Sequence, residues 1–216
     1  MTIKNFFRTM FAFALLCVLP SISFAAKPRV VFIGDSITNL WGKYHGSFFT
    51  TNNFLCKGVG GHTTGDMLKR YTADVLNQQP QVVVILAGTN DVAQQDHVVV
   101  TPEQIGNNIF HMAKLAQDAG IKVVLCSVLP ALRDDWESRE HWVPYMKSQN
   151  FIPQLNTLIE EWAANNNCEY VDYYSLFVQA DGAHDPKFSE DGTHHNVKGY
   201  YIMEQVIMPV LERMLQ

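Results

Sequence analysis

The stretch Gln81-Val-Val-Val-Ile-Leu86 is a fully apolar run bounded by polar and small residues. Such a run, rich in β-branched side chains, is typical of a strand that is buried on both faces of a parallel sheet. Four further short apolar runs are predicted to be strands, at residues 29–33, 54–57, 121–127 and 170–173. The chain is therefore expected to contain a sheet of five strands.

Helical patterns lie between these strands. Thr101-Pro-Glu-Gln104 is a capping box with proline at the first helical position, and the helix that it opens is expected to stop at Gly120. Periodic apolar residues predict further helices over residues 63–77, 151–165 and 197–215. Strands that alternate with helices imply βαβ units, so we expect one α/β domain: a three-layer α/β/α sandwich around a five-stranded parallel sheet.

The first 25 residues have the pattern of a secretory signal peptide. Lys4 and Arg8 precede an apolar stretch over residues 10–19, which is too short to span a bilayer, and Ser23-Phe-Ala25 fits a cleavage site. We expect residues 1–25 to be removed and residues 26–216 to form the exported domain, periplasmic or secreted. A lipid anchor at Cys17 is the alternative, but Leu16 stands where a small residue is expected; an uncleaved apolar anchor is weaker still.

Composition excludes several other classes of protein. The 216 residues carry 16 basic and 21 acidic side chains, a net charge of −5, and contain no run of Lys and Arg. A nucleic-acid partner is therefore not expected. No later apolar segment is long enough for an integral membrane span. Cleavage would leave three cysteines, Cys56, Cys126 and Cys168, an odd number that predicts apolar packing residues rather than a disulfide framework.

Polar motifs follow the predicted strands, where ligands bind in parallel sheets. Gly34-Asp-Ser-Ile-Thr38 follows the first strand, Gly58-Val-Gly-Gly-His62 the second and Gly88-Thr-Asn-Asp91 the third, while Asp191-Gly-Thr-His-His195 lies near the C-terminus. Ser36 is a candidate nucleophile, because a tight turn after a strand exposes its hydroxyl. A serine hydroxyl needs a base, and His194 suits that role near neutral pH. Asp191, three residues earlier, can orient the imidazole, so the three form a candidate triad.

The four motifs, in this order and at these strand ends, resemble the blocks of the SGNH or GDSL hydrolase family. The resemblance covers essentially the whole chain after residue 25, and within the family it is strongest to small exported bacterial acylhydrolases and carbohydrate esterases. It implies a flavodoxin-like fold and an ester hydrolase that uses neither a metal nor another cofactor. The chain has no G-x-S-x-G, so the nucleophile elbow of the α/β-hydrolases is excluded.

The resemblance also implies an oxyanion hole with three donors: the backbone N–H of Ser36, the backbone N–H of Gly61 and the side-chain amide of Asn90. Glycine at 61 lets the backbone approach a substrate without a Cβ in the way. The amide of Asn90 offers fixed N–H donors where negative charge develops. Asp91 is expected only to hold its loop.

Histidines near the motifs leave two questions open. The family more often has proline where His195 stands, and often a polar residue such as Asp where His62 stands, so the roles of His195 and His62 are open. A metal site formed by Asp191, His194, His195 and His62 is disfavoured, because adjacent residues rarely point at one ion. Five other histidines have no partner pattern and are expected at the surface or in loops: His45, His97, His111, His141 and His184.

Aromatic residues near the nucleophile suggest the substrate class. Trp41 and Tyr44 follow the first motif, in a segment read as a loop, and Trp142 lies in a long loop that also holds Trp136. These rings could stack on a sugar or cover an acyl chain, or they could pack the loop onto the domain. No long apolar lid segment is present, which disfavours a triglyceride lipase.

These observations predict a serine esterase that acts through an acyl-enzyme on short-chain acyl esters, foremost an O-acetylated carbohydrate or a small-molecule ester. A lysophospholipase or thioesterase is the alternative enzyme. The non-enzyme alternatives are an inactive carbohydrate-binding relative and a phosphate-binding module, and the pairing of Asp191 with His194 argues against the latter.

Overall fold

Five parallel strands form the sheet at the centre of the structure, a computed structural model that describes residues 27–93, 100–131 and 151–216. The strands are β1 (Val30–Gly34), β2 (Phe54–Gly58), β3 (Val82–Leu86), β4 (Lys122–Cys126) and β5 (Glu169–Val171). They are hydrogen-bonded in the order β2-β1-β3-β4-β5, and every pairing is parallel. All residues of β1 and β3 are buried, as expected for strands that are covered on both faces. The predicted fold class is confirmed.

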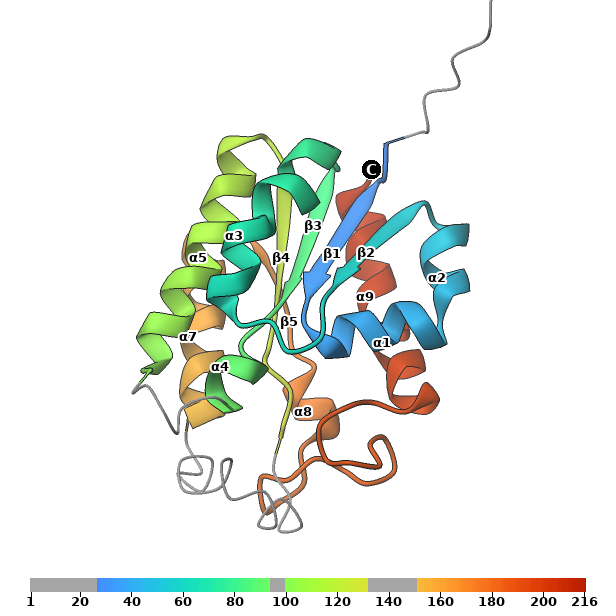
Figure 1. The fold of residues 1–216 in the computed structure, drawn as a ribbon, viewed down its shortest axis with the longest axis vertical. Coiled ribbons are helices and arrows are strands. Elements are labelled where there is room, and N and C mark those ends of the chain that lie inside the picture. Colours follow the sequence, from blue (N-terminus) through green and yellow to red (C-terminus); the bar gives the residue numbers. More distant parts are fainter. Residues whose placement is uncertain (1–26, 94–99, 132–150) are drawn as a thin grey trace, which may run out of the picture.

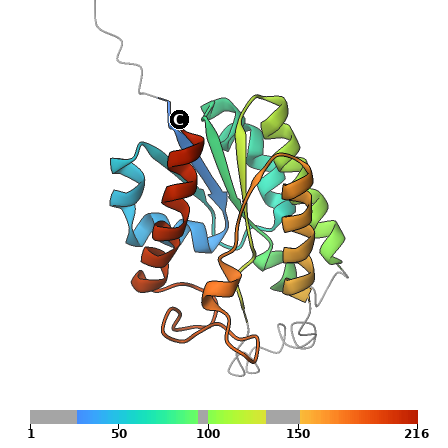
Figure 2. The same cartoon turned by 180° about the vertical axis from the view of Figure 1, so that it is seen from behind.

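Helices cover both faces of the sheet and complete the three layers (Figures 1 and 2). One face carries α3 (Thr64–Asp74), α5 (Pro102–Asp118) and α7 (Phe151–Asn165), and the other carries α1 (Ser36–Tyr44), α2 (Gly46–Thr51) and α9 (Val197–Met214). Each layer has its own apolar core against the sheet. On the α3 side Met67, Ile105 and Leu155 are fully buried; on the α9 side Met203, Ile207 and Leu211 are.

Local signals explain where the long helices begin and end. The capping box of α5 is present as predicted, because Thr101 accepts a hydrogen bond from the backbone of Gln104 and the Gln104 side chain accepts one from Thr101. The chain leaves α5 through Gly120 at a φ of +74°, a conformation that favours glycine. Asn196 caps α9 by accepting hydrogen bonds from the backbone of Lys198 and Gly199.

Four short helices differ from the sequence-based expectation. Residues 39–46 were expected to form a loop, but they continue α1 and enter α2. The short helices α4 (Thr89–Ala93) and α8 (Tyr174–Phe177) also follow strands, and neither helix was predicted. The reason is tertiary packing: Trp41 of α1 stacks on Phe48 of α2 at 5.4 Å between ring centroids, and both pack edge-on against Phe32 of β1.

The strand order places a topological switch point at the centre of the sheet. The connection from β1 to β2 runs through α1 and α2 on one face, whereas that from β2 to β3 runs through α3 on the other. The segments that follow β1, β2 and β3 therefore meet at the carboxyl edge, where ligands bind in such folds.

Neither a membrane-spanning helix nor a disulfide is present among the described residues. No helix among them is both long and apolar enough to cross a membrane. The three cysteines within the described ranges are free thiols, and Cys126 is buried in β4 as expected for a packing residue.

Candidate active site

Ser36 is the first residue of α1 and directly follows the end of β1. Asp35 caps the helix, since its Oδ1 accepts a hydrogen bond from the backbone N–H of Ile37 at 2.8 Å. Gly34 makes this abrupt junction possible: a Cβ there would lie 2.1 Å from Thr38 Oγ1 and 2.7 Å from the carbonyl oxygen of Leu86. The half-buried Ser36 side chain is thereby presented at the carboxyl edge of the sheet.

The structure brings Ser36, His194 and Asp191 into one hydrogen-bonded chain. Ser36 Oγ lies 2.8 Å from His194 Nε2, and His194 Nδ1 lies 2.6 Å from Asp191 Oδ2. A carboxylate only accepts, so Nδ1 carries the imidazole proton and Nε2 presents its lone pair to the serine hydroxyl. This tautomer is the one that a general base for Ser36 requires.

Asp191 is fixed by its own tight turn. Its Oδ1 accepts hydrogen bonds from the backbone N–H groups of Thr193 at 2.9 Å and His194 at 2.8 Å. Partial burial raises the pKa of Asp191, but the hydrogen bonds from the side chain and backbone of His194 outweigh it and lower that pKa to about 2. Asp191 is therefore an anion throughout the neutral range, and it favours the imidazolium form of His194 during proton transfer.

Two buried histidines hold the base of this loop. His195 pairs with Ser189 in an isolated β-bridge, and its Nδ1 lies 3.1 Å from His184 Nε2. The rings of both also contact Phe177, at 4.2 Å for His195 and 5.7 Å for His184. The expectation that His184 is a surface or loop residue without a partner is thus wrong in one respect: it lies in a loop but is buried and paired.

Other predicted histidine placements vary. His45 also has a partner, since its Nδ1 lies 2.8 Å from Glu204 Oε1. His111 is exposed on α5, as expected, while His97 and His141 lie outside the described residues. Within the described ranges no group of three or more His, Cys, Asp or Glu side chains is arranged to hold a metal ion.

Two of the predicted oxyanion donors, Gly61 and Asn90, lie on segments that touch each other. Gly61 has a φ of +77°, which an L-residue rarely adopts. Gly60 lies against Ser36, since a Cβ added at Gly60 would lie 3.8 Å from the Cβ of Ser36. Asn90, the second residue of α4, donates one amide hydrogen to the carbonyl oxygen of His62 at 3.1 Å. The amide has a second N–H, which is available for a substrate oxygen.

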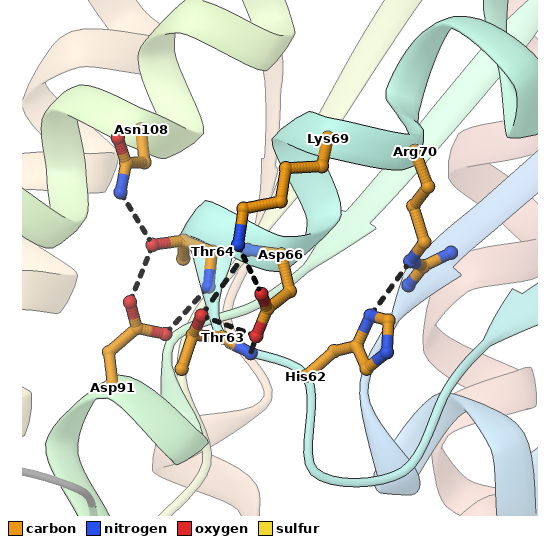
Figure 3. Close-up of polar contacts among 8 residues, drawn as sticks. All are labelled: His62, Thr63, Thr64, Asp66, Lys69, Arg70, Asp91 and Asn108. Carbon is orange, nitrogen blue, oxygen red and sulfur yellow. Dashed lines mark hydrogen bonds and ion pairs between the residues drawn. The ribbon is translucent and has the colours of Figure 1, made fainter.

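Asp91 joins the same two loops from below (Figure 3). It accepts hydrogen bonds from Thr64 Oγ1 at 2.5 Å and from the Thr64 backbone N–H at 2.9 Å, and Asn108 of α5 donates to Thr64 Oγ1. Asp91 and Thr64 are both buried. Through these hydrogen bonds Asp91 can hold its loop, which is the role expected from the sequence. The sequence analysis did not single out Thr64 or Asn108.

Arg70 of α3 is a third residue that the sequence analysis did not single out (Figure 3). Its guanidinium donates to the carbonyl oxygens of Gly34 and Lys57, both at 2.8 Å, and its Nε donates to His62 Nδ1 at 3.1 Å. It also pairs with Asp74 four residues along the helix. The spacing of Arg70 and Asp74 is visible in the sequence, but the contacts to the ends of β1 and β2 depend on the strand order.

Of the three aromatic residues considered as substrate contacts, one is buried, one lines a cavity and one lies outside the described residues. Trp41 is buried, only 1% exposed, and its indole N–H donates to Glu204 Oε1 at 3.0 Å. No substrate ring can stack on it, so the expected contact is corrected to a core role. Tyr44 is 50% exposed and lines a cavity beside His194. Trp142 lies outside the described residues.

This arrangement has the parts needed for acyl transfer. A serine lies within hydrogen-bond reach of a correctly tautomeric histidine, the histidine is oriented by an ionised carboxylate, and N–H donors lie on two adjacent loops. No group held from outside the chain is needed for this chemistry.

Comparison with known proteins shows which protein family this chain matches. The GDSL-like lipase/acylhydrolase family matches residues 32–202, from the middle of β1 to the first turns of α9. The structure of a GDSL-like lipase from Bacteroides thetaiotaomicron superposes with a TM-score of 0.78 and 39% identity, covering 88% of this chain and 92% of that one.

Two curated relatives are more distant. An acetylxylan esterase from Xylanibacter ruminicola is 27% identical over 85% of this chain and 43% of its own length. The alpha2 subunit of human platelet-activating factor acetylhydrolase IB is 26% identical over 86% of this chain and 79% of its own length. The chain spans about half the length of the first curated relatives it matches.

Proposed function

The chain belongs to the GDSL-like lipase/acylhydrolase family, a family of carboxylic ester hydrolases, and from this premise we propose that it is a serine esterase for short-chain acyl esters. The observation that carries the proposal is the hydrogen-bonded chain from Ser36 through His194 to Asp191. This geometry supports the following roles for the three residues.

In the first half-reaction, Ser36 Oγ attacks the ester carbonyl while its proton passes to His194 Nε2. The carbonyl oxygen becomes an anion, which the N–H groups of Ser36, Gly61 and Asn90 stabilise. His194 then gives the proton to the leaving alcohol oxygen as its bond to the acyl carbon breaks. In the second half-reaction water replaces the alcohol and releases the acid from the acyl-enzyme.

The acyl group is proposed to be acetyl or another short chain, and its carrier a carbohydrate. The loop beside Ser36 supports the short chain: Gly58-Val-Gly-Gly61 has only Val59 as an aliphatic side chain, so it offers little apolar wall for a long acyl group. The acetylxylan esterase relative supports an acetylated carbohydrate.

A phospholipid-type acylhydrolase is the second candidate, supported by the platelet-activating factor acetylhydrolase relative.

Export is proposed as well, from the signal-peptide pattern of residues 1–25, which lie outside the described residues.

The test uses the protein lacking residues 1–25. We expect a fluorophosphonate probe to label it and p-nitrophenyl acetate to be hydrolysed, whereas Ser36→Ala should lose both with an unchanged circular dichroism spectrum. His194→Ala should lose several orders of magnitude in kcat, because the triad acts as a unit. Full activity in Ser36→Ala would overturn the proposal. Ester series from acetate to palmitate, beside acetylated xylan and lysophospholipid, separate the two substrate classes.

A further inference from the structure

A cavity of about 360 Å³ borders the triad on the side of His194. Its lining residues come from α1 and from the loop that leads into α9: Leu40, Tyr44, Glu190, Asp191, His194, His195, Asn196 and Val197. None of them belongs to the loops that carry Gly61 and Asn90. The residues that line the cavity and the residues that carry the candidate oxyanion donors are therefore two separate sets.

This placement, together with the proposed function, decides which part of an ester occupies the cavity. The acyl carbonyl oxygen must face the oxyanion donors, whereas the leaving oxygen must lie within reach of His194 Nε2 to receive its proton. The alcohol portion of the ester therefore extends toward the histidine. A cavity lined by His194 and by no oxyanion residue is placed for that portion and not for the acyl chain.

The cavity lining indicates what kind of alcohol fits. Tyr44 and Val197 are 50% and 56% exposed and offer an aromatic ring and an aliphatic side chain to a ligand in the cavity. Three polar lining residues are already engaged: Asp191 with His194, His195 with His184, and Asn196 as the cap of α9.

Glu190 is different. Its exposed carboxylate makes no hydrogen bond or ion pair with another part of the described chain. Two lysines are sequence neighbours of lining residues but do not line the cavity themselves. Lys43 lies over the Tyr44 ring, 5.9 Å from its centroid, and Lys198 is exposed in the first turn of α9.

We propose that this cavity is the alcohol subsite of the esterase and that it selects a neutral, hydroxyl-rich ring, as in an acylated sugar, with Tyr44 as the stacking surface and Glu190 as the hydroxyl acceptor. A ring stacked on Tyr44 directs its hydroxyls to the rim, where a carboxylate accepts strong hydrogen bonds. The same carboxylate repels an anionic alcohol such as a glycerol phosphate. Glu190 and Tyr44 thus set specificity without taking part in the chemistry.

The experiment compares two esters that differ by one phosphate group, the neutral 1-acetylglycerol and the anionic 1-acetylglycerol 3-phosphate, with an acetylated xylooligosaccharide and p-nitrophenyl acetate. For the unmodified chain, kcat/KM should be at least tenfold higher for the neutral glycerol ester, and this ratio should shrink as salt screens the charge. Glu190→Gln should reduce the ratio several-fold and lower kcat/KM for the sugar ester. Tyr44→Ala should lower kcat/KM for the sugar ester about tenfold, mainly through KM.

Glu212→Gln is the matched control, because it removes the same charge from the far end of α9. It should leave all four rates unchanged. If the protein hydrolyses p-nitrophenyl acetate but Glu190→Gln and Tyr44→Ala behave like Glu212→Gln, the subsite is overturned and the esterase stands. If none of the four esters is hydrolysed, the proposed function itself fails.

Discussion

Asp91 accepts two hydrogen bonds from Thr64, one from its hydroxyl and one from its backbone N–H, and so ties the first turn of α3 to α4. Thr64 closes the loop that contains Gly61, and Asp91 is adjacent to Asn90. This buried contact between Asp91 and Thr64 (Figure 3) therefore connects the segments that carry the two candidate oxyanion donors outside α1. Pre-organised donors of this kind contribute to catalysis because they need no rearrangement when charge develops.

Replacing that carboxylate should impair the chemical step. Asp91→Asn keeps the volume but turns one acceptor into an N–H₂ group that faces the donors of Thr64. We expect kcat for p-nitrophenyl acetate to fall about ten- to a hundredfold, with KM changed less than threefold. The control is Asp118→Asn, an exposed carboxylate paired with Lys114 on α5. An unchanged kcat in Asp91→Asn would show that the two loops keep their positions without it.

Arg70 should act on the same loops from the other end. Its donors reach the carbonyl oxygen of Gly34 at the end of β1, that of Lys57 one residue before the end of β2, and His62 Nδ1. Arg70→Met leaves those partners without their donor, so we expect kcat to fall by at least tenfold and Tm to drop. Arg70→Lys, which keeps one donor group, should recover part of the Tm but little of kcat, because an ammonium cannot span three acceptors. Equal recovery of both by lysine would assign Arg70 a purely structural role.

Most of the fold could be predicted because its signals are local. Apolar runs bounded by glycine mark the strands, and the capping box at Thr101 marks the start of α5. The helix α1 was missed, because its stability comes from the packing of Trp41 against Phe32 and Phe48, residues of other elements. Helix propensity over such a short, glycine-containing segment gives no comparable signal.

The residues of the candidate site also divide into those that the sequence reveals and those that depend on the tertiary structure. Ser36 could be named because it follows a strand at the edge where ligands bind in parallel sheets. Asp191 and His194 could be named from their spacing of three residues and from the resemblance to the family's motifs. The contacts of Arg70 require the strand order, and the pairing of His184 with His195 requires a loop conformation, so neither is visible in the sequence. Trp41 was misplaced for a related reason: an aromatic residue near a nucleophile reads the same whether it faces solvent or the core.

The buried histidine pair predicts a loss of stability in acid. Burial, with a smaller contribution from His184, lowers the pKa of His195 from an ordinary value of 6.5 to about 3, and burial also lowers the pKa of His184. Below pH 6.5 His195 binds a proton in the unfolded chain but stays neutral in the folded chain until the pH approaches 3. The stability that the neutral histidine provides is therefore full above pH 6.5 and is lost as the pH falls toward 3. His195→Asn should flatten the decline in Tm between pH 6.5 and 4.5. A parallel decline in variant and parent would contradict this assignment.

Asp35 should have the opposite pH dependence. Its side chain is buried beside the nucleophile, and Oδ2 has no hydrogen-bond partner among the described residues. Burial raises the pKa of Asp35 from 3.8 to about 6, although the Ile37 N–H and the nearby His194 oppose the rise. Between these values the folded chain holds a proton that the unfolded chain has released. The stability from Asp35 is therefore full below pH 3.8 and is lost as the pH rises through 6.

Asp35→Asn removes the cost of the buried charge while its amide oxygen can still cap α1. The variant should match its parent in stability near pH 4 and exceed it above pH 6.5, by at most about 3 kcal/mol from the size of the shift. The measurement is the difference in unfolding free energy between variant and parent from urea titrations at pH 4, 5, 6 and 7.5. The acid effect of His195 is common to both proteins and cancels in that difference. A difference that stays constant with pH would mean that Asp35 does not titrate in this range, and a variant less stable at pH 7.5 would mean that its carboxylate stabilises the helix more than its burial costs.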